Sequence, residues 1–74
     1  MRTIERRFSG SRLANARRQA NLAREDVAYA LRVTVTTVAN WEQGRNAPHV
    51  DRLSDLAALL EIDVRNLFVE GDDA

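Results

Sequence analysis

A run of six β-branched residues, VTVTTV at positions 33–38, constrains the fold of this chain more than any other feature. By propensity alone the run predicts a strand, because valine and threonine fit a pleated, half-buried surface. The residues that follow, from Ala39 to Gly44, are instead typical of the end of a helix, which a glycine terminates at little cost in the left-handed conformation. Whether the run is a strand or a helix decides the function of the chain.

Two segments before this run show the spacing of apolar and small residues that is typical of helices. The first begins at Ser9 or Ser11, either of which can cap a helix, and extends to about Ala20. The second covers about residues 24–31. Asn21 lies between the two segments, and asparagine tolerates the positive φ that a break between two helices can require.

Two more helices are predicted after the run. Pro48 prevents helix continuation from the preceding segment, and helical spacing resumes over residues 50–60. Asp63 is a suitable N-cap for a last short helix over about residues 64–69. Residues 71–74 then form a solvated acidic tail.

The helical surroundings favour the helix interpretation of the run. A lone strand would leave its backbone groups unpaired, whereas a helix satisfies them internally. Thr34 then becomes the N-cap, Val38 and Trp41 share an inward face, and Gly44 ends the helix. The β-branched residues cost a few tenths of a kcal/mol each relative to alanine, which tertiary packing can override.

The helices over residues 24–31 and 35–43, joined by residues 32–34, form a helix-turn-helix. The chain resembles the lambda-repressor-like Cro/XRE family of DNA-binding domains in the string VTTVANWEQGRNAP and in the spaced residues that follow it, namely Leu53, Leu56-Ala57, Ile62-Asp63-Val64 and Leu67-Phe68. The resemblance implies an all-α, compact five-helix domain over residues 9–70. Residues 1–8 have no clear period, so we expect them to form a basic N-terminal arm.

The composition excludes several kinds of site. The chain has no cysteine and a single histidine, His49, so we expect no disulfide and no metal site. No nucleophile with a base, carboxylate dyad or phosphate loop is evident, so we expect neither an enzyme, nor a cofactor, nor a small-molecule ligand. The longest apolar stretch, residues 56–60, is too short to span a membrane, and the start MRTIERRF lacks the apolar core of a signal peptide. We therefore expect a cytoplasmic protein.

Charge is distributed unevenly although the net charge is zero. Residues 1–24 contain seven arginines and one acidic residue, whereas residues 51–74 contain two arginines and seven acidic residues. All eleven basic residues are arginine, which reflects either codon composition or a preference for bidentate phosphate contacts. The basic N-terminal part is compatible with a nucleic-acid partner.

Arg17 lies on the inward stripe of the first helix, where a charge needs a partner. Glu42 lies beside the inward face of the third helix and is the best candidate. The resembled family commonly has such an arginine–glutamate pair. We predict that Arg17 and Glu42 form a structural ion pair.

The resemblance implies that the third helix lies in the major groove of double-stranded DNA. With Val38 and Trp41 turned inward, the outward positions that correspond to the family's usual base readers are Val35, Thr36 and Asn40. Asn40 can pair bidentately with adenine, and the methyl groups of Val35 and Thr36 can pack on thymine methyl groups. We predict half-sites that contain A·T pairs.

Phosphate contacts are expected from residues that flank these readers: Arg24, Thr34, Thr37, Arg45 and Asn46. The family usually has a glutamine where Arg24 stands, and that glutamine commonly contacts a phosphate; arginine can do so with a full charge. Arg2, Arg6 and Arg7 either add contacts from the arm or belong to a disordered, solvated segment. Arg32 replaces the family's usual turn glycine, so it is expected to adopt a positive φ at a cost of about 1 kcal/mol.

Two function classes are open. The first is a transcriptional regulator, expected to be a repressor that occupies a palindromic operator as a dimer. The second is a protein-interaction module, such as a small antitoxin or adaptor, that uses its acidic C-terminal half. Any homodimer is expected to be weak, to be strengthened on DNA, and to use the region around Leu59, Ile62, Leu67 and Phe68, whose apolar residues are either core or interface.

Overall fold

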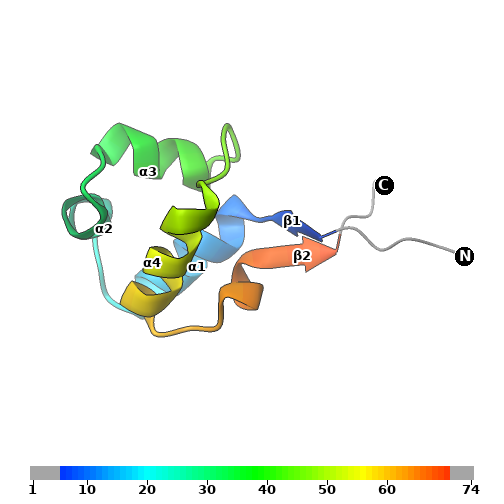
Figure 1. Ribbon diagram of the computed structural model, residues 1–74. Coiled ribbons are helices and arrows are strands. Elements are labelled where there is room, and N and C mark those ends of the chain that lie inside the picture. The colour runs from blue at the N-terminus through cyan, green and yellow to red at the C-terminus, as the bar shows by residue number, and fades with distance from the viewer. Residues whose placement is uncertain (1–5, 71–74) are drawn as a thin grey trace, which may run out of the picture.

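Four α-helices and a two-stranded sheet make up residues 6–70, the part of the chain that the computed structural model describes. In chain order the elements are β1 (Arg6–Phe8), α1 (Gly10–Gln19), α2 (Arg24–Leu31), α3 (Val35–Glu42), α4 (Val50–Leu60), the 3-10 helix η1 (Val64–Leu67) and β2 (Phe68–Glu70). The helices form one body, and the sheet projects from it at one end (Figure 1). Arg2 and the acidic tail over residues 71–74 lie outside the described residues.

The expected fifth helix is wrong, and the fold is mostly helical instead of all-α. Asp63 is the N-cap as expected, because its Oδ1 atom accepts a hydrogen bond from the Arg65 backbone N–H at 2.8 Å. The helix that follows is a single 3-10 segment, and the chain then becomes extended at Phe68. The extended backbone lets the Phe68 ring meet the Phe8 ring edge to face, with centroids 6.2 Å apart. This aromatic pair and the strand hydrogen bonds replace the last two residues of the predicted helix, 68 and 69.

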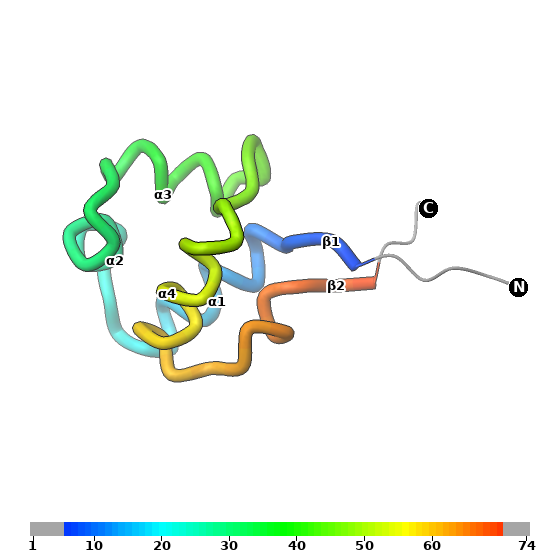
Figure 2. The backbone as a smooth tube through the Cα atoms, viewed as in Figure 1, coloured from blue at the N-terminus to red at the C-terminus, as the bar shows by residue number. Residues whose placement is uncertain are grey.

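Residues 6–8 belong to the sheet, so they are not part of a separate arm. β1 pairs with β2 in antiparallel register, with Arg6 opposite Glu70 and Phe8 opposite Phe68. The Ser9 backbone N–H extends this pairing by donating to the Leu67 carbonyl oxygen at 2.8 Å. Figure 2 shows the two ends of the described chain lying side by side. The sheet therefore ties together segments that are about 60 residues apart in the sequence.

The residues that begin the helices explain where they start. The Ser9 hydroxyl accepts from the Arg12 backbone N–H at 3.2 Å at the start of α1, and the Thr34 hydroxyl accepts from the Thr37 backbone N–H at 3.0 Å at the start of α3. Ala23 cannot cap α2 with its side chain. Instead, the Asp26 carboxylate reaches back to the Ala23 backbone N–H at 2.7 Å. The β-branched run is thus the beginning of a capped helix, as its surroundings predicted.

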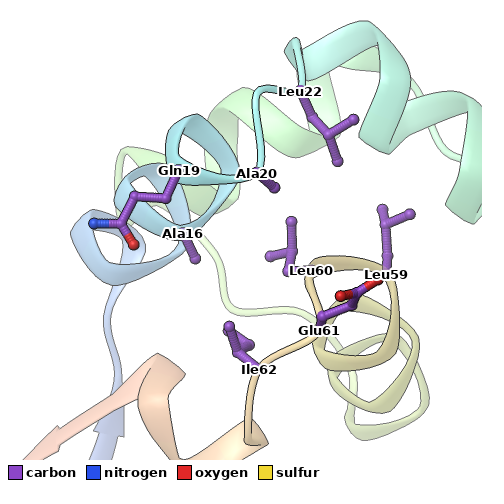
Figure 3. A pocket seen from close by; sticks show the side chains of 8 residues that line it. All are labelled: Ala16, Gln19, Ala20, Leu22, Leu59, Leu60, Glu61 and Ile62. Carbon is purple, nitrogen blue, oxygen red and sulfur yellow. The ribbon is translucent and has the colours of Figure 1, made fainter.

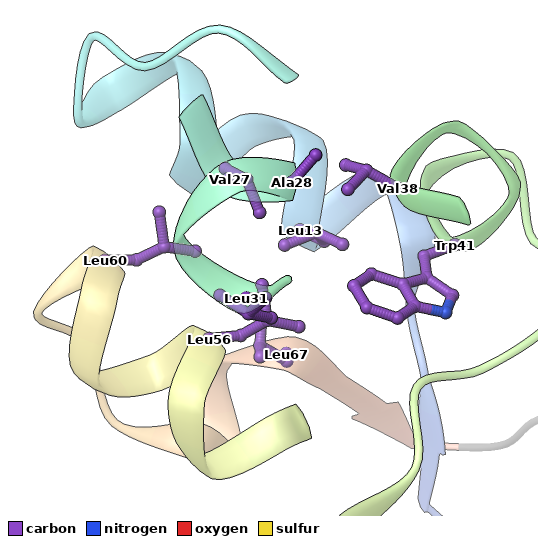
Figure 4. Packing of buried hydrophobic residues seen from close by; sticks show 9 residues of the cluster. All are labelled: Leu13, Val27, Ala28, Leu31, Val38, Trp41, Leu56, Leu60 and Leu67. Carbon is purple, nitrogen blue, oxygen red and sulfur yellow. The ribbon is translucent and has the colours of Figure 1, made fainter. Parts of the chain in front are cut away.

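One apolar cluster holds the helices and η1 together (Figure 4). Its buried members are Leu13, Val27, Ala28, Leu31, Val38, Trp41, Leu56, Leu60 and Leu67. Val38 and Trp41 face inward as predicted. Leu67 is fully buried in this core, so of the two alternatives that the sequence left open for it, core and interface, the structure shows core. Leu59, Ile62 and Phe68 are partly buried and pack against the cluster.

Arg32 ends α2 in the left-handed conformation, with φ 62° and ψ 44°. We expect Arg32→Gly to raise the free energy of unfolding by about 0.5–1 kcal/mol. The left-handed conformation costs residues other than glycine about 1–2 kcal/mol, and removing this cost is partly offset because glycine loses more backbone entropy on folding. Urea unfolding followed by circular dichroism measures this change. Asn21→Gly is the matched control, since Asn21 has nearly the same φ, 61°, but asparagine tolerates it better. Equal gains from both variants would contradict the prediction.

Candidate nucleic-acid interface

The outer face of α3 presents the three predicted base readers. Val38 is fully buried and Trp41 nearly so, which fixes the rotation of the helix about its axis. Val35 and Thr36 are exposed, and Asn40 is half-buried. Thr36 and Asn40 are four residues apart and therefore lie on one side of the helix. The arrangement leaves two methyl-bearing side chains and one amide uncovered on the first two turns of α3.

Two threonines at the start of α3 are held together by their own hydrogen bonds. The Thr34 and Thr37 hydroxyl oxygens are 2.9 Å apart, and the Thr34 hydroxyl also accepts the backbone bond that caps the helix. Both residues were predicted to contact phosphates. The structure shows that Thr34 already has a structural role at this position, while its side chain is exposed.

The loop after α3 carries the other two predicted phosphate contacts, Arg45 and Asn46, and both are exposed. Gly44 opens this loop with φ 79°, and the Arg45 backbone N–H donates to the Asn40 carbonyl oxygen at 2.9 Å. An Arg45 Nη1 atom also lies 3.4 Å from the Asn40 side-chain oxygen. The loop therefore places the Arg45 guanidinium group at the edge of α3, beside the Asn40 side-chain amide. This contact was not predicted from the sequence.

Arg17 and Glu42 lie in contact, in the pairing that the sequence suggested. Arg17 Nε donates to Glu42 Oε2 at 2.6 Å, and Arg17 Nη2 to Glu42 Oε1 at 3.2 Å. Arg17 Nη1 donates to the Leu22 carbonyl oxygen at 2.9 Å, in the connection between α1 and α2. Only 11% of the Arg17 side chain and 2% of the Glu42 side chain are exposed. The pair thus joins α1, its connection to α2, and the C-terminal end of α3.

Arg24 is a third member of this cluster, which the sequence analysis missed. Its Nε atom donates to Glu42 Oε1 at 2.9 Å. Burial alone would raise the pKa of Glu42, but the hydrogen bonds from Arg17 and Arg24 outweigh it and hold the pKa below its ordinary value of 4.5. The hydrogen bond to Glu42 likewise raises the pKa of Arg17. The carboxylate is therefore ionised at neutral pH, between two guanidinium groups.

A model of the helix-turn-helix family matches residues 13–67, which include all four helices from Leu13 onward. The chain belongs to the Cro/C1-type helix-turn-helix family. This family is one of regulators that bind double-stranded DNA, so the chain is a DNA-binding regulator. No curated protein sequence matches the chain.

The Cro/C1-type domain is similar in structure to the restriction-modification controller protein C.AhdI from Aeromonas hydrophila, which was solved by crystallography at high resolution. The two share 29% sequence identity with a TM-score of 0.73. The similarity covers 80% of this chain and 89% of the controller protein. It therefore extends over most of both chains.

Gly10, which the sequence analysis did not single out, sets the distance between α1 and α3 in this helix-turn-helix domain. A Cβ atom at this position would overlap the carbonyl oxygens of Trp41 and Glu42, and it would lie 2.7 Å from the Glu42 carbonyl carbon. The absent side chain lets the first turn of α1 approach the backbone at the end of α3. This approach places Arg17, seven residues further along α1, within reach of Glu42.

The remaining predicted residues lie elsewhere on the domain. Arg6 and Arg7 are on β1, which projects from the body on the side opposite to α2 and the start of α3 (Figure 1). Leu59 and Ile62 line a shallow hollow of about 450 Å³ between the C-terminal ends of α1 and α4 (Figure 3). The structure thus gathers the α3 readers and their flanking cations, and separates them from both of these regions.

Two further features bear on the expected absences. Within residues 6–70, no helix has the length and apolar character needed to cross a membrane. In the same range, no group of three or more acidic, histidine or cysteine side chains is arranged to hold a metal ion.

Proposed function

We propose that the chain is a sequence-specific transcriptional repressor that binds a palindromic operator as a dimer, with α3 in the major groove. The observation that carries the proposal is the uncovered outer face of α3, which presents Val35, Thr36 and Asn40 on a helix whose inner face is buried. A major groove admits an α-helix, and outward residues near the start of the helix then meet base edges.

The chemistry of these three side chains suits A·T pairs. The Asn40 amide carries both the donor and the acceptor that adenine N7 and N6 require, while the Val35 and Thr36 methyl groups match the thymine methyl group. The distance of 3.4 Å between Arg45 and the Asn40 side-chain oxygen is long for a hydrogen bond, so the amide can exchange that contact for a base. A base pair with adenine opposite Asn40 is therefore the expected target.

Residues around α3 supply phosphate contacts. Arg24 is the first residue of α2 and contacts Glu42 at the C-terminal end of α3, and Arg45 and Asn46 lie in the loop after α3. Thr34 and Thr37 offer hydroxyls at the start of α3. Such contacts fix the position of the helix on the duplex and carry no sequence information themselves.

Dimeric binding follows from the geometry of the target. One reading helix of this length covers only a few base pairs, so two copies on half-sites one helical turn apart gain both affinity and specificity. The similarity to a restriction-modification controller protein supports a regulatory role. Occupation of an operator is sufficient to exclude polymerase, which makes repression the simplest outcome of binding.

Selection from randomised duplexes tests the proposal. We expect the native chain to enrich inverted half-sites that contain A·T pairs, and to bind them as two chains per duplex. Asn40→Ala is expected to relax the preference at one position in each half-site, by about 1–3 kcal/mol of discrimination. Asn66→Ala, the same change on η1, is the matched control and is expected to leave the selected sequence unchanged.

The outcomes separate the elements of the proposal. Half-sites of G·C pairs alone would contradict the roles given to Asn40, Val35 and Thr36. A complex with one chain per duplex would contradict the dimer. Enrichment of no sequence at modest salt would contradict sequence-specific binding, and would favour a protein-interaction module on the same fold.

A further inference from the structure

Arg24 uses only one side of its guanidinium group within the protein. An arginine side chain offers five N–H donors, of which the Nε–H of Arg24 is bound to Glu42 Oε1 at 2.9 Å. The two terminal nitrogens of Arg24 make no hydrogen bond to another residue among residues 6–70. The side chain is 37% exposed, so part of it is accessible to a ligand.

The carboxylate that holds Arg24 is itself held by Arg17 and is buried. Arg17 binds both oxygens of Glu42, and a third nitrogen of Arg17 is bound to the Leu22 carbonyl oxygen. Glu42 is almost completely buried, and Gly10 brings the first turn of α1 against its backbone. Arg24 is therefore attached to a fixed point in the fold, which removes much of the freedom that a long surface side chain would otherwise lose on binding.

Arg24 is not needed to satisfy this carboxylate. Arg17 alone gives Glu42 a bidentate pair, and no buried side-chain nitrogen or oxygen among residues 6–70 is without a partner. The cluster of one carboxylate and two guanidinium groups carries a net positive charge. Its free donors are the paired Nη groups of Arg24, whose planar geometry matches two oxygens of a phosphate.

We propose that Glu42 is a positioning residue, which holds the Arg24 guanidinium group with its Nη edge outward for a phosphate of the DNA backbone. This inference rests on the proposed function, because it deepens the phosphate contact expected of Arg24. Arg24 is the first residue of α2 and Glu42 the last of α3, so the contact fixes both helices of the motif on the duplex. A carboxylate thereby contributes to binding a polyanion.

Glu42→Gln gives a test in which the sign of the effect decides. The change removes a negative charge near the DNA, so charge repulsion alone predicts tighter binding. Loss of the fixed Arg24 predicts weaker binding, by roughly tenfold, the size of one charge-assisted hydrogen bond. Affinity for the selected duplex is measured by fluorescence anisotropy, at a temperature where circular dichroism shows the variant folded.

Arg24→Lys and Arg24→Gln keep the test decisive if Glu42→Gln does not fold. Lysine keeps the positive charge but lacks the planar pair of Nη groups, so we expect binding to be weaker by roughly fivefold, with its salt dependence unchanged. Glutamine loses the charge as well, and the slope of log K against log salt should fall by about 0.9. Arg12→Gln is the charge-matched control, because Arg12 lies on the side of α1 that faces Ile62 and Asn66.

Each result has a defined meaning. Native affinity for Arg24→Lys, or tighter binding by folded Glu42→Gln, would overturn the inference, and so would equal losses in Arg24→Gln and Arg12→Gln. In these cases the native chain still selects a sequence, and the proposed function stands. If the native chain binds no duplex selectively, the proposed function fails and the inference fails with it.

Discussion

Gly10→Ala is expected to lower the free energy of unfolding by about 2–3 kcal/mol, the upper part of the range of about 1–3 kcal/mol that is typical when a well-packed contact is overfilled. The added Cβ atom would overlap the carbonyl oxygens of Trp41 and Glu42, which belong to the backbone and cannot rotate away. The first turn of α1 must therefore move away from the end of α3. In a domain of this size the midpoint of thermal unfolding should fall by roughly 10–20 °C, as measured by circular dichroism.

Gly44→Ala is the matched control for this substitution. Gly44 has φ 79°, and a Cβ atom there would meet no atom of residues 6–70 within 4 Å. The expected cost is about 1–2 kcal/mol, which comes from the left-handed conformation alone. A Gly10→Ala variant as stable as the native chain would show that α1 and α3 are not in close contact at this point. Arg17 and Glu42 would then have to meet by some other arrangement of the helices.

The helices were predictable because their signals are local. Ser9, Thr34 and Asp63 cap the segments that the sequence assigned to them, and α2 and α4 have the predicted bounds. The β-branched run was ambiguous by propensity, and only the helices around it decided the matter. Packing of Val38 and Trp41 into the core is the physical reason that context overrides propensity here.

The sheet was not predictable from local patterns. Each strand has three residues, and neither strand is stable without the other. Their pairing joins the two ends of the described chain, so the signal would have to be read across the whole sequence. The residues that hold this signal are Phe8 and Phe68, two aromatic side chains that each require a packing partner. The predicted fifth helix failed at Phe68 for this reason.

Within the candidate site, too, some contacts were predictable from the sequence and others were not. Arg17 was identified because an inward arginine requires a partner, and Glu42 because it lies beside the inward face of the third helix and the resembled family commonly has such a pair. Arg24, Arg45 and Gly10 were given no contact within the protein, because theirs depend on how separate elements approach each other. The base-reading roles of the α3 residues stay predictions, since they concern DNA and the fold alone does not test them.

Arg17→Met is expected to lower the free energy of unfolding by about 2–3 kcal/mol at neutral pH. Breaking a buried ion pair usually costs about 3–5 kcal/mol, but Arg24 still pairs with the Glu42 carboxylate in this variant. The substitution also leaves the Leu22 carbonyl oxygen without its arginine donor. Arg18→Met is the matched control on the same helix. Arg18 is exposed, and among residues 6–70 its side chain has only a 3.4 Å contact with Asn15, so a change of about 0.5 kcal/mol or less is expected.

The pH dependence of the free energy of unfolding distinguishes the contribution of the Arg17–Glu42 ion pair from that of the packing of the Arg17 side chain. The pKa of Glu42 in the folded protein lies below the ordinary value of 4.5, so its stabilising effect is complete above that pH and is lost as the pH falls through the lowered pKa. In Arg17→Met the carboxylate keeps its burial but loses its bidentate partner, which brings its pKa upward. The native chain should therefore lose more stability than the variant between about pH 7 and about pH 3, and the difference between them should narrow. Urea unfolding at both pH values measures this. A difference that stays constant would mean that Arg17 stabilises the fold by packing alone, and that the charge on Glu42 contributes nothing to holding α1 against α3.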